Sequence, residues 1–222
     1  MQLAPNVYLL DAATNANVFL IKDGDCKILI DTGLPGMAGA ILRELDTLGA
    51  GRLTAILLTH HDMDHTGNAY EIQRASGAAA YIGADDLPYV LHDKERPGSQ
   101  WAYHHMLRPR PPARLRRLEK YDLPGGVQAI PTPGHTPGHH AFLYRRVLFC
   151  GDMLKSSPAA KPLRMPESAH QWPQRLKGSL LALLPYPFRL LCPSHGAPLP
   201  NDEELRRFIR REAGESVTMS AG

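Results

Sequence analysis

The sequence predicts an α/β protein in which two β-sheets pack face to face and helices cover their outer sides. Two observations predict this: each half of the chain runs from short apolar strand patterns into helical patterns, and polar residues gather directly behind several strands. With 43% hydrophobic and 21% charged residues, the chain can build one continuous core. We expect residues 1–213 to form a single domain and the Gly-, Ser- and Ala-rich residues 214–222 to form a disordered tail.

The first half begins with a hairpin-rich segment and then alternates strands with helices. Short apolar runs bounded by polar or Gly turns predict strands at residues 7–10, 17–21, 27–30, 53–58 and 78–82. Helical spacing of apolar residues predicts helices at 37–48, around 67–75 and at 85–91. The segment 59–65 lies between a strand and a helix and is expected to be a polar loop.

The second half repeats this order. Apolar runs predict strands at 127–130, 141–144, 147–150 and 188–192, and helical patterns are present at 171–184 and 202–211. Between the halves, residues 92–118 are rich in Pro and Arg and break the alternation. We expect this segment to be a surface excursion, acting either as a lid or as a solvated connector. Its arginines are at positions 96, 108, 110, 114, 116 and 117.

Composition excludes several functional classes. A net charge of +3 is too balanced to predict nucleic-acid binding, and no apolar run approaches the length of a membrane span. The first 25 residues lack a basic start and a continuous apolar stretch, so we expect a cytoplasmic protein. Cys26, Cys150 and Cys192 are odd in number and lie in apolar runs, which predicts reduced, buried thiols.

Four polar clusters follow predicted strands or lie in turns between them. They contain these His and Asp residues: His60, Asp62, Asp64, His65, His135, Asp152 and His195. Imidazole nitrogen and carboxylate oxygen bind divalent cations, and seven such side chains suffice for two metals that share a bridging ligand. The pattern His-x-Asp-x-Asp-His has a chance expectation on the order of 0.002 in a chain of this composition. Coincidence is therefore a poor explanation for the first cluster.

The first cluster resembles a motif of the metallo-β-lactamase superfamily, usually written T-H-x-H-x-D-H. Residues 57–67 read LLTHHDMDHTG, and the later clusters follow in the order of that family: TPGHTPGH at 132–139, GD at 151–152 and SHG at 194–196. LIDTG at 29–33 is similar to a further family segment. The resemblance covers residues 7 to about 200, and the segment 132–139 is similar to those of glyoxalase II-type thioesterases and acyl-homoserine lactonases.

The resemblance implies a four-layer αβ/βα sandwich with two metals in a cleft at one edge. It places His60, Asp62 and His135 around the first metal, and Asp152 between the two metals. It places Asp64, His65 and His195 around the second metal. A hydroxide bridging the metals would be the nucleophile, with Asp64 and Asp152 as the catalytic carboxylates.

One position departs from the family pattern. Asp62 stands where the motif usually has its second histidine, so the first site would contain more carboxylate than usual. A harder, more anionic ligand set favours iron or manganese over zinc, although zinc can still fill such a site. We therefore expect two divalent ions of Zn, Fe or Mn.

Three further residues lie beside the predicted ligands. Asp31 is expected to be a buried carboxylate that steadies the motif loop, with direct metal binding as the alternative. His61 occupies the variable position of the motif and is a loop residue, a support for a ligand, or an adventitious ligand. His139 either hydrogen-bonds to substrate or to a ligand carboxylate, or is a partly exposed residue at the start of a strand.

The leading functional hypothesis is a metal-dependent hydrolase of a carboxylic ester, thioester or lactone. The alternatives are an Fe(II) oxygenase similar to persulfide dioxygenases, a phosphodiesterase, and a scaffold without metals. The complete second-site set, Asp64, His65 and His195, favours two metals over one. The expected partner is a small-molecule substrate, which would be anionic if the arginines of 92–118 cover the cleft. We expect no binding of nucleic acid or membrane. A homodimer is one of the possible oligomeric states.

Overall fold

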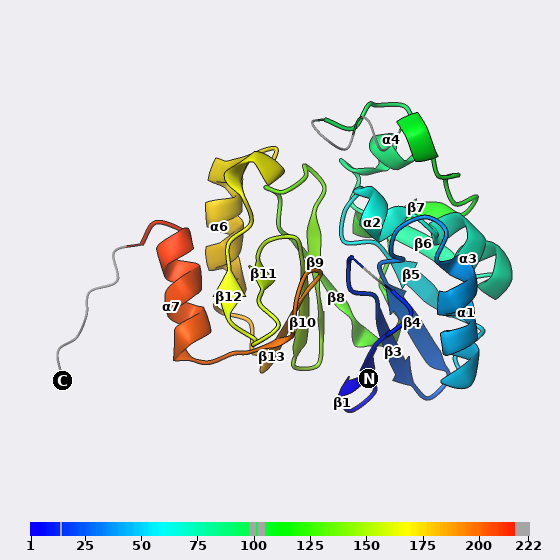
Figure 1. The fold of residues 1–222 in the computed structure, drawn as a ribbon, viewed down its shortest axis with the longest axis horizontal. Coiled ribbons are helices and arrows are strands. Elements are labelled where there is room, and N and C mark those ends of the chain that lie inside the picture. Colours follow the sequence, from blue (N-terminus) through cyan, green and yellow to red (C-terminus); the bar gives the residue numbers. More distant parts are fainter. Residues whose placement is uncertain (14, 98–100, 102–104, 216–222) are drawn as a thin grey trace.

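The computed structural model describes residues 1–13, 15–97, 101 and 105–215. Two β-sheets lie back to back, and helices cover the outer side of each sheet, so the molecule has four layers (Figure 1). The predicted α/β sandwich is confirmed. The two sheets come from the two halves of the chain, as the repeated strand-to-helix order indicated.

The first sheet has seven strands in chain order. The first four strands form an antiparallel meander, and the next three are parallel to the fourth. They are β1 (Gln2–Ala4), β2 (Val7–Leu9), β3 (Phe19–Asp23), β4 (Cys26–Ile30), β5 (Ala55–Leu57), β6 (Ala79–Ile82) and β7 (Leu115–Arg117). β5 and β6 are buried along their length, because helices cover one face and the second sheet covers the other, whereas β7 at the edge of the sheet is partly exposed.

The second sheet has five strands in the order β14-β13-β10-β9-β8. Its strands are β8 (Gln128–Pro131), β9 (His140–Tyr144), β10 (Val147–Gly151), β13 (Leu190–Pro193) and β14 (Leu199–Pro200). β10 and β13 are parallel, and the other pairs are antiparallel. A separate small hairpin of β11 (Lys155–Ser156) and β12 (Pro162–Leu163) follows β10.

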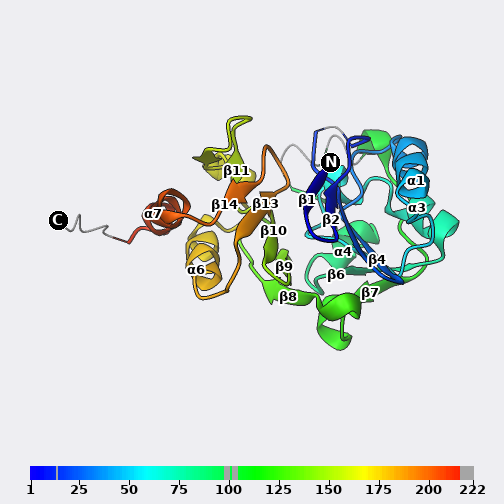
Figure 2. The ribbon, with the colours of Figure 1, turned by 90° about the horizontal axis from the view of Figure 1, so that it is seen from below.

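The helices are amphipathic, and their apolar sides face the sheets. On the first sheet these are α1 (Ala38–Thr47) and α3 (Ala69–Ser76), and on the second they are α6 (Pro173–Leu183) and α7 (Glu203–Glu212). Figure 2 shows both pairs on opposite outer sides. Shorter helical segments are α2 (Met63–Thr66), α4 (Leu87–Val90), η1 (Leu118–Lys120), η2 (Pro124–Gly126) and η3 (Glu167–Ala169).

Three apolar clusters correspond to the three interfaces between the layers. The central cluster joins the two sheets and includes Phe19 and Phe149, whose ring centroids are 5.1 Å apart. A second cluster packs Ile41 of α1 and Ile72 of α3 against the first sheet. A third packs α6 and α7 against the second sheet. Burial of this apolar surface holds the four layers together, and it fixes the sheet edge where the polar loops meet.

Several expectations from the sequence were wrong in detail. The excursion 92–118 ends in β7, which is hydrogen-bonded to β6 and completes the first sheet. Arg96, expected at the surface, is 1% exposed. The predicted loop 59–65 contains the start of helix α2, and the thiol of Cys26 is only half-buried. Strands β1, β11, β12 and β14 were not predicted, because each has three residues or fewer and shows no clear period.

Within the described part of the chain, no helix is long and apolar enough to cross a membrane. Of the predicted tail, residues 216–222 lie outside the described residues, and so do residues 98–100 and 102–104 of the excursion.

Candidate metal centre

The polar clusters predicted from the sequence meet at one edge of the sandwich. Each lies in a loop that follows a strand: β5 and β8 lead to His60 and His135, and β10 and β13 lead to Asp152 and His195. All seven side chains predicted as ligands fall into three overlapping groups, and within each group the donor atoms lie within 4.8 Å of one another. Three groups of this kind at one place are the arrangement expected of a metal centre.

Asp31, at the end of β4, organises the loop that carries the first four of these residues. Its Oδ1 accepts hydrogen bonds from the backbone N–H of Thr59 at 2.8 Å and from the Thr59 hydroxyl. Its Oδ2 accepts from Nδ1 of His65 at 2.8 Å. Asp31 has a φ of 59°, a left-handed conformation that Asp tolerates better than most residues. Buried and fully engaged with the loop, Asp31 is a support for His65.

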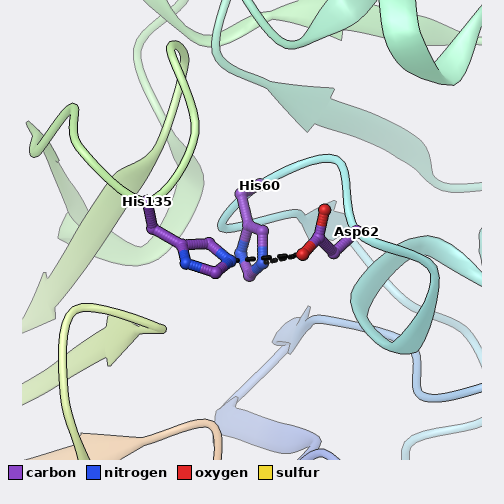
Figure 3. A group of neighbouring side chains, drawn as sticks. All are labelled: His60, Asp62 and His135. Carbon is purple, nitrogen blue, oxygen red and sulfur yellow. Dashed lines mark hydrogen bonds and ion pairs between the residues drawn. The ribbon is translucent and has the colours of Figure 1, made fainter. Parts of the chain in front are cut away.

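The first group consists of His60, Asp62 and His135 (Figure 3). Nε2 of His135 lies 3.2 Å from Oδ2 of Asp62, and Nε2 of His60 lies 3.7 Å from the same oxygen. His60 and Asp62 come from the first half of the chain, whereas His135 comes from the second. All three side chains are buried.

The second group consists of Asp64, His65 and His195, and Asp152 lies between the two groups. Nε2 of His195 lies 3.5 Å from Oδ2 of Asp64 and 3.2 Å from Oδ2 of Asp152. Oδ1 of Asp152 lies 3.5 Å from Nε2 of His65, and its Oδ2 lies 3.7 Å from Nε2 of His135. One carboxylate therefore contacts imidazoles of both groups, which is the position of a bridging ligand.

The histidines present the same ring nitrogen to the centre. In three of them Nδ1 is engaged by an oxygen: His60 by the Thr59 hydroxyl at 2.9 Å, His65 by Asp31, and His195 by the backbone carbonyl of Asn15 at 2.8 Å. When a cation displaces the proton of Nε2, the proton that stays on Nδ1 keeps these hydrogen bonds, which is the state in which imidazole binds a metal.

The charge state of these side chains also fits a cation. Burial disfavours a charge on His65, but Asp64, Asp31 and Asp152 outweigh it and raise the pKa of His65 to about 10. Burial likewise opposes the negative charge of Asp152, yet the neighbouring His65 and His195 hold its pKa well below the usual range. Asp152 is thus ionised and attracts positive charge at this point.

Divalent metal ions fit the residues present. His60 Nε2, His65 Nε2 and Asp152 Oδ1 are buried and have no hydrogen-bond partner within the described residues. Buried polar atoms normally have partners, and these atom types are donors for borderline divalent cations. All three atoms belong to residues that were predicted as metal ligands.

His61 and His139 support the centre from behind. His61 is buried, its ring stacks on Tyr89 with centroids 4.3 Å apart, and its Nδ1 lies 3.2 Å from Oδ1 of Asp62. His139 is also fully buried, and its Nε2 accepts a hydrogen bond from the backbone N–H of Asp152 at 3.2 Å. His139 therefore holds the loop of a ligand and has no exposed surface for a substrate.

Sequence reasoning missed Asp86, which joins the two loops that carry the first group. Its carboxylate accepts hydrogen bonds from the backbone N–H of His61 at 2.9 Å, from the Thr136 hydroxyl at 2.6 Å and from the backbone N–H of Gly138 at 2.6 Å. In the sequence Asp86 looks like an ordinary cap before α4, but its side chain makes no capping bond. Nothing in its spacing signals the tertiary role.

Arg96, His170 and Gln171 were missed as well. Arg96 donates from Nη2 to the Thr66 hydroxyl at 3.2 Å, and burial lowers its pKa to about 10. Nδ1 of His170 lies 3.3 Å from Nδ1 of His135, and Nε2 of Gln171 lies 3.0 Å from Nε2 of His61. These residues lie 30 to 110 positions from their partners, so local pattern could not identify them.

Comparison with known proteins gives a family and several relatives. The model of the metallo-β-lactamase superfamily matches residues 12–195. A probable metallo-hydrolase of Bacillus subtilis (strain 168), YflN, is 35% identical over 164 residues, which cover 62% of this chain and 60% of YflN. A hydroxyacylglutathione hydrolase of Shewanella baltica (strain OS185) is 29% identical over 208 residues, covering 88% of this chain and 62% of the relative. The chain thus spans about three fifths of the length of these two curated relatives.

Solved structures show the same architecture. The protein TTHA1623 in a di-iron-bound form superposes with a TM-score of 0.68 at 27% identity, covering 90% of this chain and 93% of that one. The metallo-β-lactamase FIM-1 from Pseudomonas aeruginosa, in its mono-zinc form, has a TM-score of 0.72 at 17% identity over 96% and 93% of the two chains, a likeness of fold. With the family match extending over most of the sandwich and all seven side chains gathered at its edge, the chain belongs to the metallo-β-lactamase superfamily.

Proposed function

We propose that this protein is a metal-dependent hydrolase that acts on a carboxylic ester, thioester or lactone with two divalent cations. The observation that carries the proposal is the position of Asp152, which contacts imidazoles of both groups of candidate ligands. A centre of this kind suits hydrolysis because two cations can act on one water and one carbonyl group. The names of the relatives, metallo-hydrolase and hydroxyacylglutathione hydrolase, support the same reaction class.

One cation would be held by His60, Asp62 and His135. The other would be held by Asp64, His65 and His195, and Asp152 would bind both cations. Bound there, the cations would lower the pKa of water and polarise the carbonyl oxygen of the substrate.

Asp64 is placed to take part in proton transfer. Its side chain is half-buried, and its Oδ2 accepts a hydrogen bond from Nδ2 of Asn15 at 3.0 Å. This bond fixes the carboxylate beside His195 and Asp152, where it can orient a water molecule and accept its proton.

For the metals, the carboxylate of Asp62 favours iron or manganese. It contributes a hard oxygen donor where the family motif has imidazole, and hard donors favour Fe and Mn relative to Zn. The similar structure of a di-iron-bound protein supports this choice.

For the substrate, a pocket that reaches His170, the neighbour of His135, favours a small molecule with an apolar part. The cavity has a volume of about 470 Å³ and reaches His170 and Met153, the neighbour of Asp152. Leu176, Leu180 and Phe208 form apolar walls, and side chains of both charges line it as well: Arg164, Lys177, Arg211, Glu167 and Glu212. Burying an apolar chain of the substrate against these walls would stabilise binding.

Elemental analysis of protein purified without added metal or chelator tests this proposal, followed by assays with lactones, thioesters and carboxylic esters. We expect about two equivalents of Fe, Mn or Zn per chain and hydrolysis of at least one of these classes that a chelator abolishes. If the protein instead holds one equivalent of iron and consumes oxygen when persulfides are added, it is an oxygenase and not a hydrolase. If the protein hydrolyses only phosphodiesters, the assignment as a metal-dependent hydrolase stands and the proposed substrate class is wrong.

A further inference from the structure

We infer that His170 and Gln171 are positioning residues for the first group, and that they orient His135 and Asp62 for cation binding. The inference rests on the proposed function, because it concerns the metals of that centre. Beyond that function, two adjacent residues that lead into α6 would support two ligands that come from different halves of the chain.

His170 supports His135 through the ring nitrogen that faces away from the centre. The two Nδ1 atoms lie 3.3 Å apart, and their rings are nearly perpendicular, at 83°. If His135 binds a cation through Nε2, its proton is on Nδ1, and that N–H donates to the unprotonated Nδ1 of His170. The other three histidine ligands donate to oxygen atoms. His135 is the one among these four whose orientation depends on a second imidazole.

Gln171 supports Asp62 through His61. An amide nitrogen can only donate, so Nε2 of His61 accepts from Nε2 of Gln171 at 3.0 Å, and the proton of His61 is on Nδ1. That Nδ1 lies 3.2 Å from Oδ1 of Asp62. The stacked ring of Tyr89 restricts rotation of His61, so the tautomer and the ring plane are both set. Gln171 thereby places the protonated Nδ1 of His61 in close electrostatic contact with Oδ1 of Asp62, without a hydrogen bond between them, and Oδ2 faces His135 and His60.

The backbone of the same segment fixes the loop of His135. The N–H of Gln171 donates to the carbonyl of His135 at 3.0 Å, and the N–H of Trp172 donates to the carbonyl of Gly134 at 2.8 Å. Gly134 lies so close to α6 that a Cβ there would come within 2.6 Å of Leu176. The side-chain contacts of His170 and Gln171 are therefore made from a rigidly docked segment, which is what support of a metal ligand requires.

The unusual ligand at position 62 explains why such support is needed. A carboxylate can rotate about its Cβ–Cγ bond and offer either of two equivalent oxygens, whereas an imidazole offers a single Nε2. The contact of His61 with Oδ1 of Asp62 restricts that rotation and keeps Oδ2 on the side of His60 and His135. Without His170 and Gln171, the orientations of His135 and Asp62 would both loosen.

Four single variants test this inference: His170→Leu, His170→Asn, Gln171→Leu and, as the matched control, Gln174→Leu. Asn keeps an acceptor oxygen near the place of the His170 Nδ1, and Gln174 is an exposed glutamine on α6. Cation affinity is measured by competition with a chromogenic chelator, using Mn²⁺ and Zn²⁺, and thermal melting of the chelated protein reports the fold.

We expect His170→Leu and Gln171→Leu each to lower the affinity for one of the two cations about 10- to 100-fold and to leave the affinity for the other unchanged. The melting of the chelated protein should stay near that of the wild type, and His170→Asn and Gln174→Leu should bind both cations normally. Wild-type affinity for both cations in the two Leu variants would overturn the inference, and so would equal loss of both cations with a lower melting temperature. A wild-type chain that binds no cation would overturn the proposed function as well.

Discussion

The carboxylate of Asp31 accepts a hydrogen bond from Nδ1 of His65 at 2.8 Å and joins the end of β4 to helix α2. The same carboxylate accepts the backbone N–H of Thr59, so one buried charge fixes both the start of the ligand loop and the ring of a ligand. Because an anion beside Nδ1 makes the imidazole a stronger donor at Nε2, Asp31 influences the metal without contacting it.

Replacing Asp31 with Asn removes this charge and keeps a residue type that tolerates the left-handed backbone at this position. We expect the affinity for one of the two cations to fall about 10- to 100-fold in chelator competition. Unfolding free energy should also fall by about 1–3 kcal/mol, because the new amide N–H₂ faces donors. Asp25→Asn in the exposed β3–β4 turn serves as the control. Unchanged affinity in the Asp31 variant would contradict its role.

Replacing Asp152 or His135 with Ala removes a ligand that the proposed function requires. We expect each variant to lose bound metal and all hydrolysis, because Asp152 contacts both groups and His135 completes the first. Elemental analysis and hydrolysis assays check this, with Asp122→Ala at an exposed position as the control. Full activity in either variant would rule out this assignment of the site.

Asp86 should make the stability of the metal-free protein depend on pH. Burial raises the pKa of Asp86 to about 7, whereas an unfolded Asp has a pKa of about 3.9. Between these values the folded protein holds a proton that the unfolded chain has released, so stability falls as pH rises.

Raising the pH from 5 to 8 should therefore lower the contribution of Asp86 to the unfolding free energy by about 2–3 kcal/mol. Urea unfolding at both pH values, in chelator, compares the wild type with Asp86→Asn, in which this part of the dependence should be absent. Equal pH dependence in the two proteins would be evidence against a proton on Asp86.

Gly83 allows the loop of His135 to approach the first sheet. A Cβ at Gly83 would overlap the carbonyl oxygen of Gly138 and come within 2.8 Å of Nδ1 of His140. We expect Gly83→Ala to lower the unfolding free energy by about 1–3 kcal/mol in urea titrations, and to weaken cation binding by moving that loop. The matched control is Gly178→Ala on α6, where a Cβ has open space and should slightly stabilise the helix. Similar effects of both changes would contradict this explanation.

Much of the fold was predictable because it depends on local periodicity. The helix expected at 37–48 is α1, Ala38–Thr47, since Ile41 and Leu45 recur at helical spacing and are buried. Helix α2 was not predicted, because four residues are too few to show a period. The Arg- and Pro-rich excursion looked like surface, and only the three-dimensional packing shows that Arg96 is buried and that 115–117 pair with β6.

The metal centre was predictable in part for a similar reason. Its seven candidate ligands directly follow strands or lie in turns between them, so their types and order are visible in the sequence. The residues that orient these ligands cannot be recognised in the sequence in this way. Asp86 and His170 act through contacts 25 to 52 positions away, and neither has a neighbour in the sequence that signals this role.

The candidate ligands come from both sheets: His60, Asp62, Asp64 and His65 follow the first, and His135, Asp152 and His195 belong to the second. Cations bound between them would tie the two halves together, so part of the binding free energy would resist separation of the sheets. A chelator would then act on this protein as a mild denaturant, and metal supply in the surrounding solution would set how long the folded chain survives proteolysis.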